Sequence, residues 1–329
     1  MWITNPISSL NNINIMRKYF NFLMAFIASL TFSVMIVHGT EIKAAKKKIV
    51  FVAGKDSHGR GEHEFRAGCH LLAKLLNESR PDINAVVTED GWPADLSIFE
   101  GADAIVMYSD GGEGHMVMPH LEEVDKLAKK GVGIVLMHYA VEVPKGKAGD
   151  YLSSWVGGYF ETFYSVNPIF TPEFVPFPKH PITNGVKPFV IKDEWYYHMR
   201  FVDSKKITPI LSAHPPLSTL LPAPSSDHGN NEFVRKDLQD GKLQTMAWAF
   251  ERADGGRGFG FTGSHYHSSW ANDDFRKLVI NAIVWSAKLK VPKDGVITRT
   301  PTAVEMEYLV KAPRTRPAST APKPAVPAN

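Results

Sequence analysis

Short apolar runs alternate with longer segments of helical periodicity over the first half of the chain. Apolar runs without polar alternation are typical of strands buried on both faces of a parallel sheet, and the helical segments between them supply the crossovers. The predicted strands are 48–53, 83–88, 104–108 and 132–137, and the predicted helices are 62–77 and 119–130. This order predicts an α/β fold with a mostly parallel sheet and helices on both faces.

The second half is less regular. Residues 146–167 are rich in Gly, Ser and aromatic side chains, which is typical of an elaborated loop, here expected over the site. The predicted short strands are 169–175, 189–191, 208–212, 245–250 and 258–262, and the last core helix is 272–288. The sequence has no internal repeat, so we expect one domain over 46–290.

A histidine or carboxylate follows almost every predicted buried strand. The carboxyl ends of parallel strands meet at one edge of a sheet, where open α/β folds bind their ligands. These side chains are therefore expected to gather at one site. They are Asp56, His58, His63, Asp110, Glu113, His115, His138, Asp193, Glu194, His198, His265 and His267.

The two ends differ in composition from the middle. Arg17 and Lys18 precede an apolar run over 19–37, and small residues follow near Gly39, so residues 1–45 are predicted to be a cleaved export signal and a short linker. An uncleaved anchor is the alternative, because 19 residues can just span a bilayer. Either way the domain is expected outside the cytoplasm, as a periplasmic or secreted protein. Residues 291–329 are rich in Pro and Ala and are predicted to be a largely disordered tail.

Charge and cysteine content exclude several classes of protein. The net charge is +3, with much of the excess in the tails and no basic face interleaved with aromatics, so nucleic acid is not an expected partner. The single cysteine, Cys69, excludes an intrachain disulfide and a thiolate metal cluster. Its helical spacing with Phe65 and Leu72 predicts a buried packing role.

The run 131–137 ends abruptly on His138, which resembles the nucleophile elbow of α/β enzymes. No Ser or Cys stands at that position, which disfavours acyl transfer. An imidazole there suits a general base, a general acid or a metal ligand. The alternative is a histidine that only hydrogen-bonds a neighbouring loop.

The segment 193–198 places two carboxylates beside three aromatic residues. Carboxylates bind sugar hydroxyls and aromatic rings stack on sugars, so the segment fits a carbohydrate site; an ordinary charged turn is the alternative. The predicted catalytic residues are His138, Glu194 and His265, and the predicted substrate-binding residues are His63, Asp110, Tyr139, Trp195, Tyr196 and His267.

A metal site has no local signature. Neither H-E-x-x-H nor H-x-x-E-H occurs, so the hypothesis of a divalent cation such as zinc depends on proximity in the fold. The candidate ligands are His63, His138 and His265. No other cofactor is indicated.

Several loose motifs in a fixed order resemble the trehalose-utilisation (ThuA-like) family. They are His63 at the entry of the first helix, the Gly-rich strand ending in His138, the segments 180–185 and 193–196, and the run from Gly260 through His265 to Trp285. The resemblance covers about 47–289. It implies a flavodoxin-like domain with the three-layer sandwich of class I glutamine amidotransferases but without their cysteine. It also implies a role in sugar catabolism, on oxidised (keto) sugars or glycosides.

Two functional hypotheses follow. In the first, the chain is an exported carbohydrate-active enzyme in which His138 and His265 flank a sugar and Glu194 is the partner acid or base. In the second, it is a non-catalytic sugar-binding or scaffolding module. The expected partner is a small sugar or sugar derivative, membrane contact is expected only through the N-terminal segment, and a homo-oligomer is compatible with either hypothesis.

Overall fold

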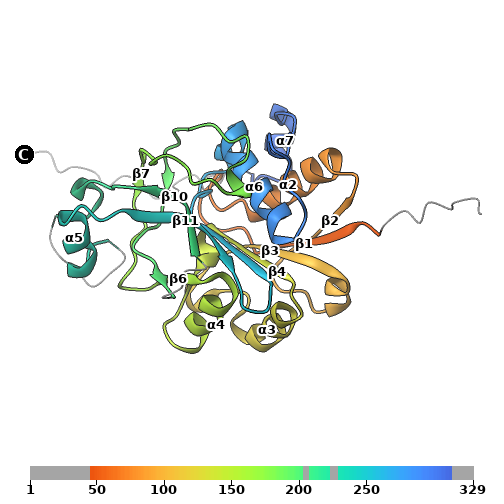
Figure 1. Ribbon diagram of the computed structural model, residues 1–329, viewed down its shortest axis with the longest axis horizontal. Coiled ribbons are helices and arrows are strands. Elements are labelled where there is room, and N and C mark those ends of the chain that lie inside the picture. The colour runs from red at the N-terminus through yellow and green to blue at the C-terminus, as the bar shows by residue number, and fades with distance from the viewer. Residues whose placement is uncertain (1–44, 203–206, 223–228, 313–329) are drawn as a thin grey trace, which may run out of the picture. The chain divides into compact units, whose positions relative to one another are not determined.

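The computed structural model describes residues 45–202, 207–222 and 229–312. Its centre is a seven-stranded sheet with the order β10-β11-β12-β4-β3-β1-β2 (Figure 1). The strands are β1 Lys47–Ala53, β2 Ile83–Thr88, β3 Ala102–Tyr108, β4 Gly133–Met137, β10 Ile207–Ala213, β11 Gln244–Glu251 and β12 Arg257–Phe261. The pairs β1–β2, β1–β3, β3–β4 and β4–β12 are parallel, and only β11 runs against its neighbours. This confirms the predicted mostly parallel sheet.

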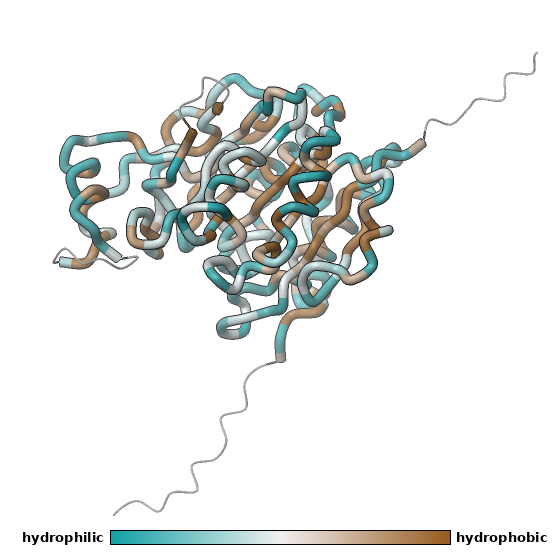
Figure 2. Tube along the Cα trace, turned by 90° about the horizontal axis from the view of Figure 1, so that it is seen from below, coloured by the Kyte–Doolittle hydropathy of each residue, from teal (hydrophilic) through white to brown (hydrophobic). Residues whose placement is uncertain are grey.

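Helices cover both faces of the sheet. Helices α2 Phe65–Ser79 and α6 Asp273–Ser286 lie on one face, and α3 Leu121–Lys129 and α4 Lys147–Val156 lie on the other (Figure 1). Along β1 the side chains alternate between two apolar cores: Phe51 packs under α2 and α6, whereas Val50 and Val52 pack under α3 and α4. The apolar strands between more polar helices are visible in Figure 2.

Smaller elements decorate the carboxyl edge and one end of the sheet. The strands β5 Glu142–Val143, β6 Gly158–Glu161 and β9 Arg200–Phe201 form one small sheet, and β7 Ile169–Phe170 pairs with β8 Asp193–Glu194. The other helices are α5 Glu232–Gln239 and α7 Ala303–Glu307. The 3₁₀ turns are Leu96–Phe99, Gly112–Gly114, Met118–His120, His138–Val141, Pro181–Thr183, Leu217–Thr219 and His267–Ala271.

The segment 146–167, which we expected to be a loop, begins with the regular helix α4. Leu152, Trp155 and Val156 lie at helical spacing and are buried, and Gly157 ends the helix in the left-handed conformation. The expected strand 169–175 is cut short because Pro172 and Pro176 cannot donate to a strand ladder. Residues 189–191 form no strand, and pairing begins only at β8.

The domain extends past the predicted boundary at 290. Val291 and Val296 are buried, and the Val296 N–H donates to Asn281 Oδ1 at 2.8 Å. Residues 291–312 therefore pack on the domain, because scattered apolar residues anchor the segment. The export segment and residues 313–329 lie outside the described residues. Within the described part, every helix is too short or too polar to cross a lipid bilayer.

Candidate functional site

Four side chains from four separate segments converge at the carboxyl edge of the sheet. His63 precedes α2, His138 follows β4, Glu194 ends β8, and His265 follows β12. One ligand atom from each lies within 4.8 Å of all the others. We call this group the histidine–glutamate cluster. All three predicted catalytic residues and the predicted binding residue His63 are therefore brought together.

His138 occupies a strained elbow at the end of β4. Its φ is +54°, a left-handed conformation that is costly for a residue with a side chain and is typical of functional sites. Its Nδ1 lies 2.9 Å from the carbonyl oxygen of Thr262, so Nδ1 carries the hydrogen. Burial lowers the pKa of the His138 imidazole well below its usual range. The ring is therefore neutral, and the Nε2 lone pair faces the cluster.

His63 is held in the same way from the opposite side. Its φ is +46°, and its backbone N–H donates to the His265 carbonyl oxygen at 3.0 Å. Its Nδ1 lies 2.9 Å from Asp110 Oδ1 and 3.0 Å from Ser57 Oγ. Burial lowers the pKa of His63, although the hydrogen bond to Asp110 acts in the opposite direction. The Nδ1 hydrogen therefore points to Asp110, and Nε2 is left to accept.

His265 and Glu194 form the other half of the cluster. His265 Nδ1 lies 3.2 Å from Glu194 Oε2. Burial alone would lower the pKa of His265, but the hydrogen bond to Glu194 raises it above its ordinary value. Asn167 Nδ2 donates to Glu194 Oε1 at 3.2 Å and fixes the second carboxylate oxygen.

The adjacent carboxylates of Asp193 and Glu194 have different tasks. Asp193 is fully buried and accepts the backbone N–H groups of Ser264 and His265 and the hydroxyl of Ser269. Burial raises the pKa of Asp193, against the effect of these donors. Asp193 thus shapes the turn that carries His265, while Glu194 faces the cluster.

The cluster has the chemistry of a cation site. His63 Nε2 lies 3.0 Å from His138 Nε2 and 3.0 Å from His265 Nδ1. Because the hydrogens of His63 and His138 are on Nδ1, two lone pairs face each other at hydrogen-bond distance with no proton between them. In a tetrahedral zinc site with Zn–N distances of about 2.0–2.1 Å, ligand nitrogens lie about 3.3 Å apart. The Asp110 carboxylate and the Thr262 carbonyl, which accept the Nδ1–H groups of His63 and His138, are acceptors of the kind usually found behind metal-ligating histidines.

The other predicted binding residues divide into two groups. The Tyr196 hydroxyl lies 3.2 Å from both His138 Nε2 and Glu194 Oε2. The centroid of the Tyr139 ring lies 5.9 Å from that of the His63 ring. Both tyrosines, and Asp110, therefore border the cluster as expected.

Trp195 and His267 do not join the cluster. Successive side chains of an extended segment point to opposite sides, so Trp195 points away from Glu194 and Tyr196 and is buried against Phe261 and Phe275. It supports the core and cannot be a binding wall. His267 is buried beside residues of α7 instead, because the 3₁₀ turn that begins there leads the chain away.

Sequence reasoning assigned no role to some members of the site and missed others. His58 follows β1 and was expected at this edge, and the centroid of its ring lies 3.7 Å from that of the His63 ring, but no catalytic or binding role was predicted for it. Its place beside His63 and Asp110 forms a second group of metal-ligand type. Ser57 and the Thr262 carbonyl carry no sequence signal, since a backbone acceptor is available at every residue.

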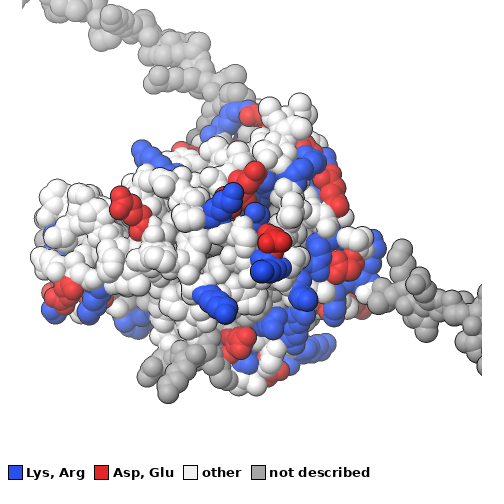
Figure 3. Space-filling model, turned by 45° about the horizontal axis from the view of Figure 1, so that its top comes forward, with Lys and Arg blue, Asp and Glu red and all other residues white. Residues whose placement is uncertain are grey.

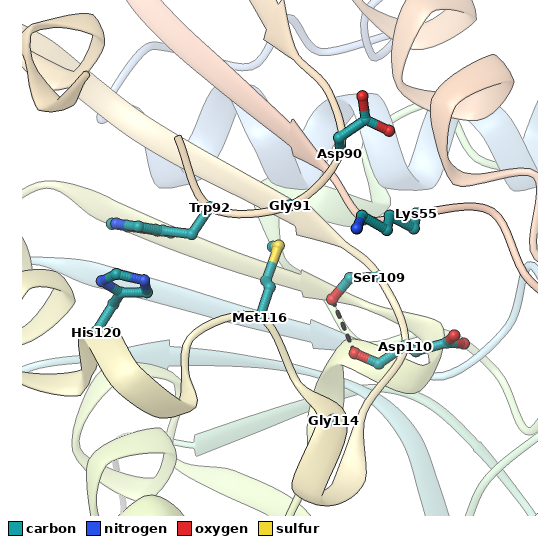
Figure 4. A pocket seen from close by; sticks show the side chains of 10 residues that line it. Lys55, Asp90, Gly91, Trp92, Ser109, Asp110, Gly114, Met116 and His120 are labelled. Atoms are coloured by element: carbon teal, nitrogen blue, oxygen red, sulfur yellow. Dashed lines mark hydrogen bonds between the residues drawn. The ribbon is translucent and has the colours of Figure 1, made fainter. Parts of the chain in front are cut away.

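A cavity of about 440 Å³ is lined by Asp110, whose carboxylate also bonds His63 of the cluster (Figure 4). Lys55 and Ser109 lie on one side of it, and Trp92 and His120 lie on the other. The Trp92 ring is stacked between Phe99 and His120, which makes that wall rigid.

The mostly parallel sheet, its two helical layers and the histidine-rich carboxyl edge define an α/β protein with a candidate site at the carboxyl ends of its strands. The chain belongs to the ThuA family, described as trehalose utilisation, whose model matches residues 49–286. This confirms the resemblance seen in the sequence, and it indicates a role in sugar metabolism.

Three solved structures are similar to this chain to different degrees. A ThuA-like protein from Bacteroides uniformis is similar at a TM-score of 0.50 and 17% identity, over 74% of this chain and 92% of that one. A ThuA-like protein from Parabacteroides merdae has a TM-score of 0.46 and 15% identity, over 78% of this chain and 98% of that one. A glutamine amidotransferase from Thermotoga maritima has a TM-score of 0.41 and 8% identity, over 74% of this chain and 98% of that one. The first likeness supports the fold alone. A search of curated proteins gave no match.

Proposed function

We propose that the chain is a carbohydrate-active enzyme that acts on an oxidised (keto) sugar or glycoside with a divalent cation such as zinc. The observation that carries the proposal is the convergence of three imidazole nitrogens and one carboxylate within 4.8 Å. Membership of the trehalose-utilisation family supports a sugar as the substrate. When bound, a cation of this kind polarises a carbonyl oxygen and increases the acidity of neighbouring groups.

The orientation of each group assigns its part in the chemistry. His63, His138 and His265 would hold the cation, since Asp110 and Thr262 turn the first two with their Nε2 atoms inward. Three nitrogens leave a fourth position open, as in catalytic zinc sites. Glu194 Oε2, which lies 3.2 Å from His265 Nδ1 and 3.6 Å from His138 Nε2, would remove the proton next to the sugar carbonyl. The outcome would be isomerisation or elimination; hydrolysis is the other reaction that such a site supports.

Two variants test the ligands and the base separately. The protein is stripped with a chelator, reloaded with Zn²⁺ or Mn²⁺, and assayed on a keto-disaccharide and on its unoxidised parent. Glu194→Gln should retain the metal and lose about 10²-fold or more in kcat. His138→Ala should lose both turnover and the bound metal. Unchanged turnover in Glu194→Gln would remove its role as the base.

The same assay tests the alternative of a non-catalytic sugar-binding module. Binding of the keto-sugar in titration calorimetry, without product under any metal condition, would favour that module over the enzyme. Conversion of the keto-sugar, but not of its parent, would support the enzyme.

We also propose that residues 1–45 direct export, from the basic pair Arg17–Lys18 and the apolar run that follows it. Fractionation of cells that express the whole chain, with sequencing of the mature N-terminus, tests this. A full-length protein in the cytoplasm would contradict it.

A further inference from the structure

The chain continues past the family-matched region and folds back along α2. Residues 296–311, which we call the C-terminal strap, include α7, and α7 lies beside α2 in Figure 1. Arg299 pairs with Glu78 on α2 and with Glu305 on α7, and Lys74 of α2 pairs with Glu305 at 2.6 Å. The strap is therefore anchored along the helix that begins at the cluster.

The far end of the strap contacts the loop that carries His63. The Lys311 ammonium donates to the carbonyl oxygens of Ser57 and Glu62, the latter at 2.6 Å. The Lys311 N–H donates to Glu64 Oε2 at 3.0 Å. From the loop, Arg60 donates back to the Lys311 carbonyl oxygen and to the Glu307 carboxylate.

This loop, residues 57–64, needs support from outside itself. His58 and His63 adopt left-handed φ values of +63° and +46°, which cost free energy for residues with a side chain. Glu64 is fully buried at the end of the loop, and its carboxylate accepts the Gly61 N–H at 2.7 Å. The Lys311 ammonium lies 3.9 Å from the same carboxylate and supplies the opposite charge that a buried carboxylate requires.

The other side of the loop is already fixed. The His267 N–H donates to the Gly61 carbonyl oxygen at 2.8 Å, and the His63 N–H donates to that of His265. Lys311 therefore holds the side of the loop opposite to His265 and His267. Its ammonium group bridges two carbonyl groups that lie on either side of His58 and close the loop.

We propose that Lys311 is a positioning residue that holds loop 57–64 in the conformation presenting His63 Nε2 to the histidine–glutamate cluster. The effect on the loop stands on these contacts alone, whereas the effect on metal binding rests on the proposed function. Lys311 lies outside the residues matched by the family model, so the device belongs to the extension of this chain.

The test compares Lys311→Met, Lys311→Arg and the control Lys74→Met in the full chain. Lys74→Met loosens the strap on α2 without removing a contact to the loop. Amide hydrogen exchange of residues 57–64 and Zn²⁺ affinity by competition with a chelating dye are measured. In Lys311→Met, the rate of amide exchange in residues 57–64 should rise about tenfold. The Zn²⁺ affinity should fall about tenfold, which is the lower end of the range observed when an outer partner of a metal site is lost. Lys311→Arg should restore most of both, and Lys74→Met should change neither.

Each outcome decides the proposal. Unchanged exchange in Lys311→Met overturns it, and so does faster exchange with unchanged Zn²⁺ affinity, because the lysine would then not position His63. If the wild-type protein binds no Zn²⁺, the proposed metal function fails, while the exchange result still decides whether Lys311 holds the loop. If Lys311→Met does not fold, Arg60→Met releases the strap from the loop side and is measured in its place.

Discussion

The carboxylate of Asp193 accepts the backbone N–H of His265 at 2.9 Å, although Asp193 itself does not face the cluster. The same carboxylate accepts the N–H of Ser264, whose φ is +80°. A buried anion therefore determines the path of a strained turn, and the turn determines where His265 Nδ1 lies. Asp193 precedes Glu194, so one two-residue strand supplies both the support of the turn and a member of the cluster.

Asp193→Asn should destabilise the fold and weaken metal binding together. The Asp193 carboxylate accepts four donors, namely the backbone N–H groups of Glu194, Ser264 and His265 and the hydroxyl of Ser269. An asparagine side chain presents one acceptor oxygen and one NH₂ donor to them, so at least one buried N–H loses its partner at a cost of about 1–3 kcal/mol. Urea unfolding followed by tryptophan fluorescence measures the loss. Glu113→Gln, which changes an exposed carboxylate at the same edge, is the control. Equal stabilities of the two variants would contradict the role of Asp193.

Asp110→Asn should weaken Zn²⁺ binding by about 10- to 100-fold with little change in the fold. Asp110 is the acceptor that orients the Nδ1 hydrogen of His63, and the loss of such outer partners has this effect at metal sites. Asp90 lines the same neighbouring cavity as Asp110 but has no hydrogen bond to His63, so Asp90→Asn is a matched control. A similar affinity in both variants would exclude the orienting role.

The architecture and the convergence of the cluster follow from sequence by a general rule. The apolar runs of β1, β4 and β12 indicate parallel buried strands, and parallel strands deliver the residues after them to one edge. His63, His138 and His265 meet there for that reason. The same argument carries no information on which ring nitrogen faces inward, because that depends on partners such as Thr262, 124 residues away from His138.

The errors have equally local causes. Trp195 was grouped with its neighbours in the sequence, but the alternation of an extended segment turns it into the core. Helix α4 was hidden by its Gly and Ser residues, since only the burial of Leu152 and Trp155 against the sheet stabilises it. The C-terminal strap was hidden because it was grouped with the proline-rich residues that follow it, although the strap itself contains only Pro301.

Tyr196→Phe should reduce kcat on a keto-sugar about tenfold and leave Zn²⁺ affinity close to that of the wild type. The hydroxyl group donates to Glu194 at 3.2 Å, and burial raises the pKa of Tyr196 well above its ordinary value, so it remains a donor. Its loss frees the proposed base to adopt less productive orientations. Tyr197→Phe is the control, since that hydroxyl bonds Thr219 away from the cluster. Equal kcat values for the two variants would argue against this role.

Acid should destabilise the domain through His115, which lies beneath the edge of the sheet. Its Nε2–H donates to the Ala140 carbonyl oxygen at 3.0 Å, and its Nδ1 accepts the Val117 N–H at 3.1 Å. The neutral ring satisfies both partners, whereas a protonated ring could not accept from Val117. Burial accordingly lowers the pKa of His115 to about 4.

The sign of the pH effect follows from the two protonation states. In the unfolded chain the His115 pKa is about 6.5, so between pH 6.5 and 4 the unfolded state binds more protons and stability falls as the pH falls. The contribution is complete above pH 6.5, and about 3 kcal/mol is lost by pH 4. Urea unfolding at pH 7, 5.5 and 4.5 should therefore show a smaller decline in His115→Gln than in the wild type. Parallel slopes for the two proteins would assign the acid sensitivity to other groups.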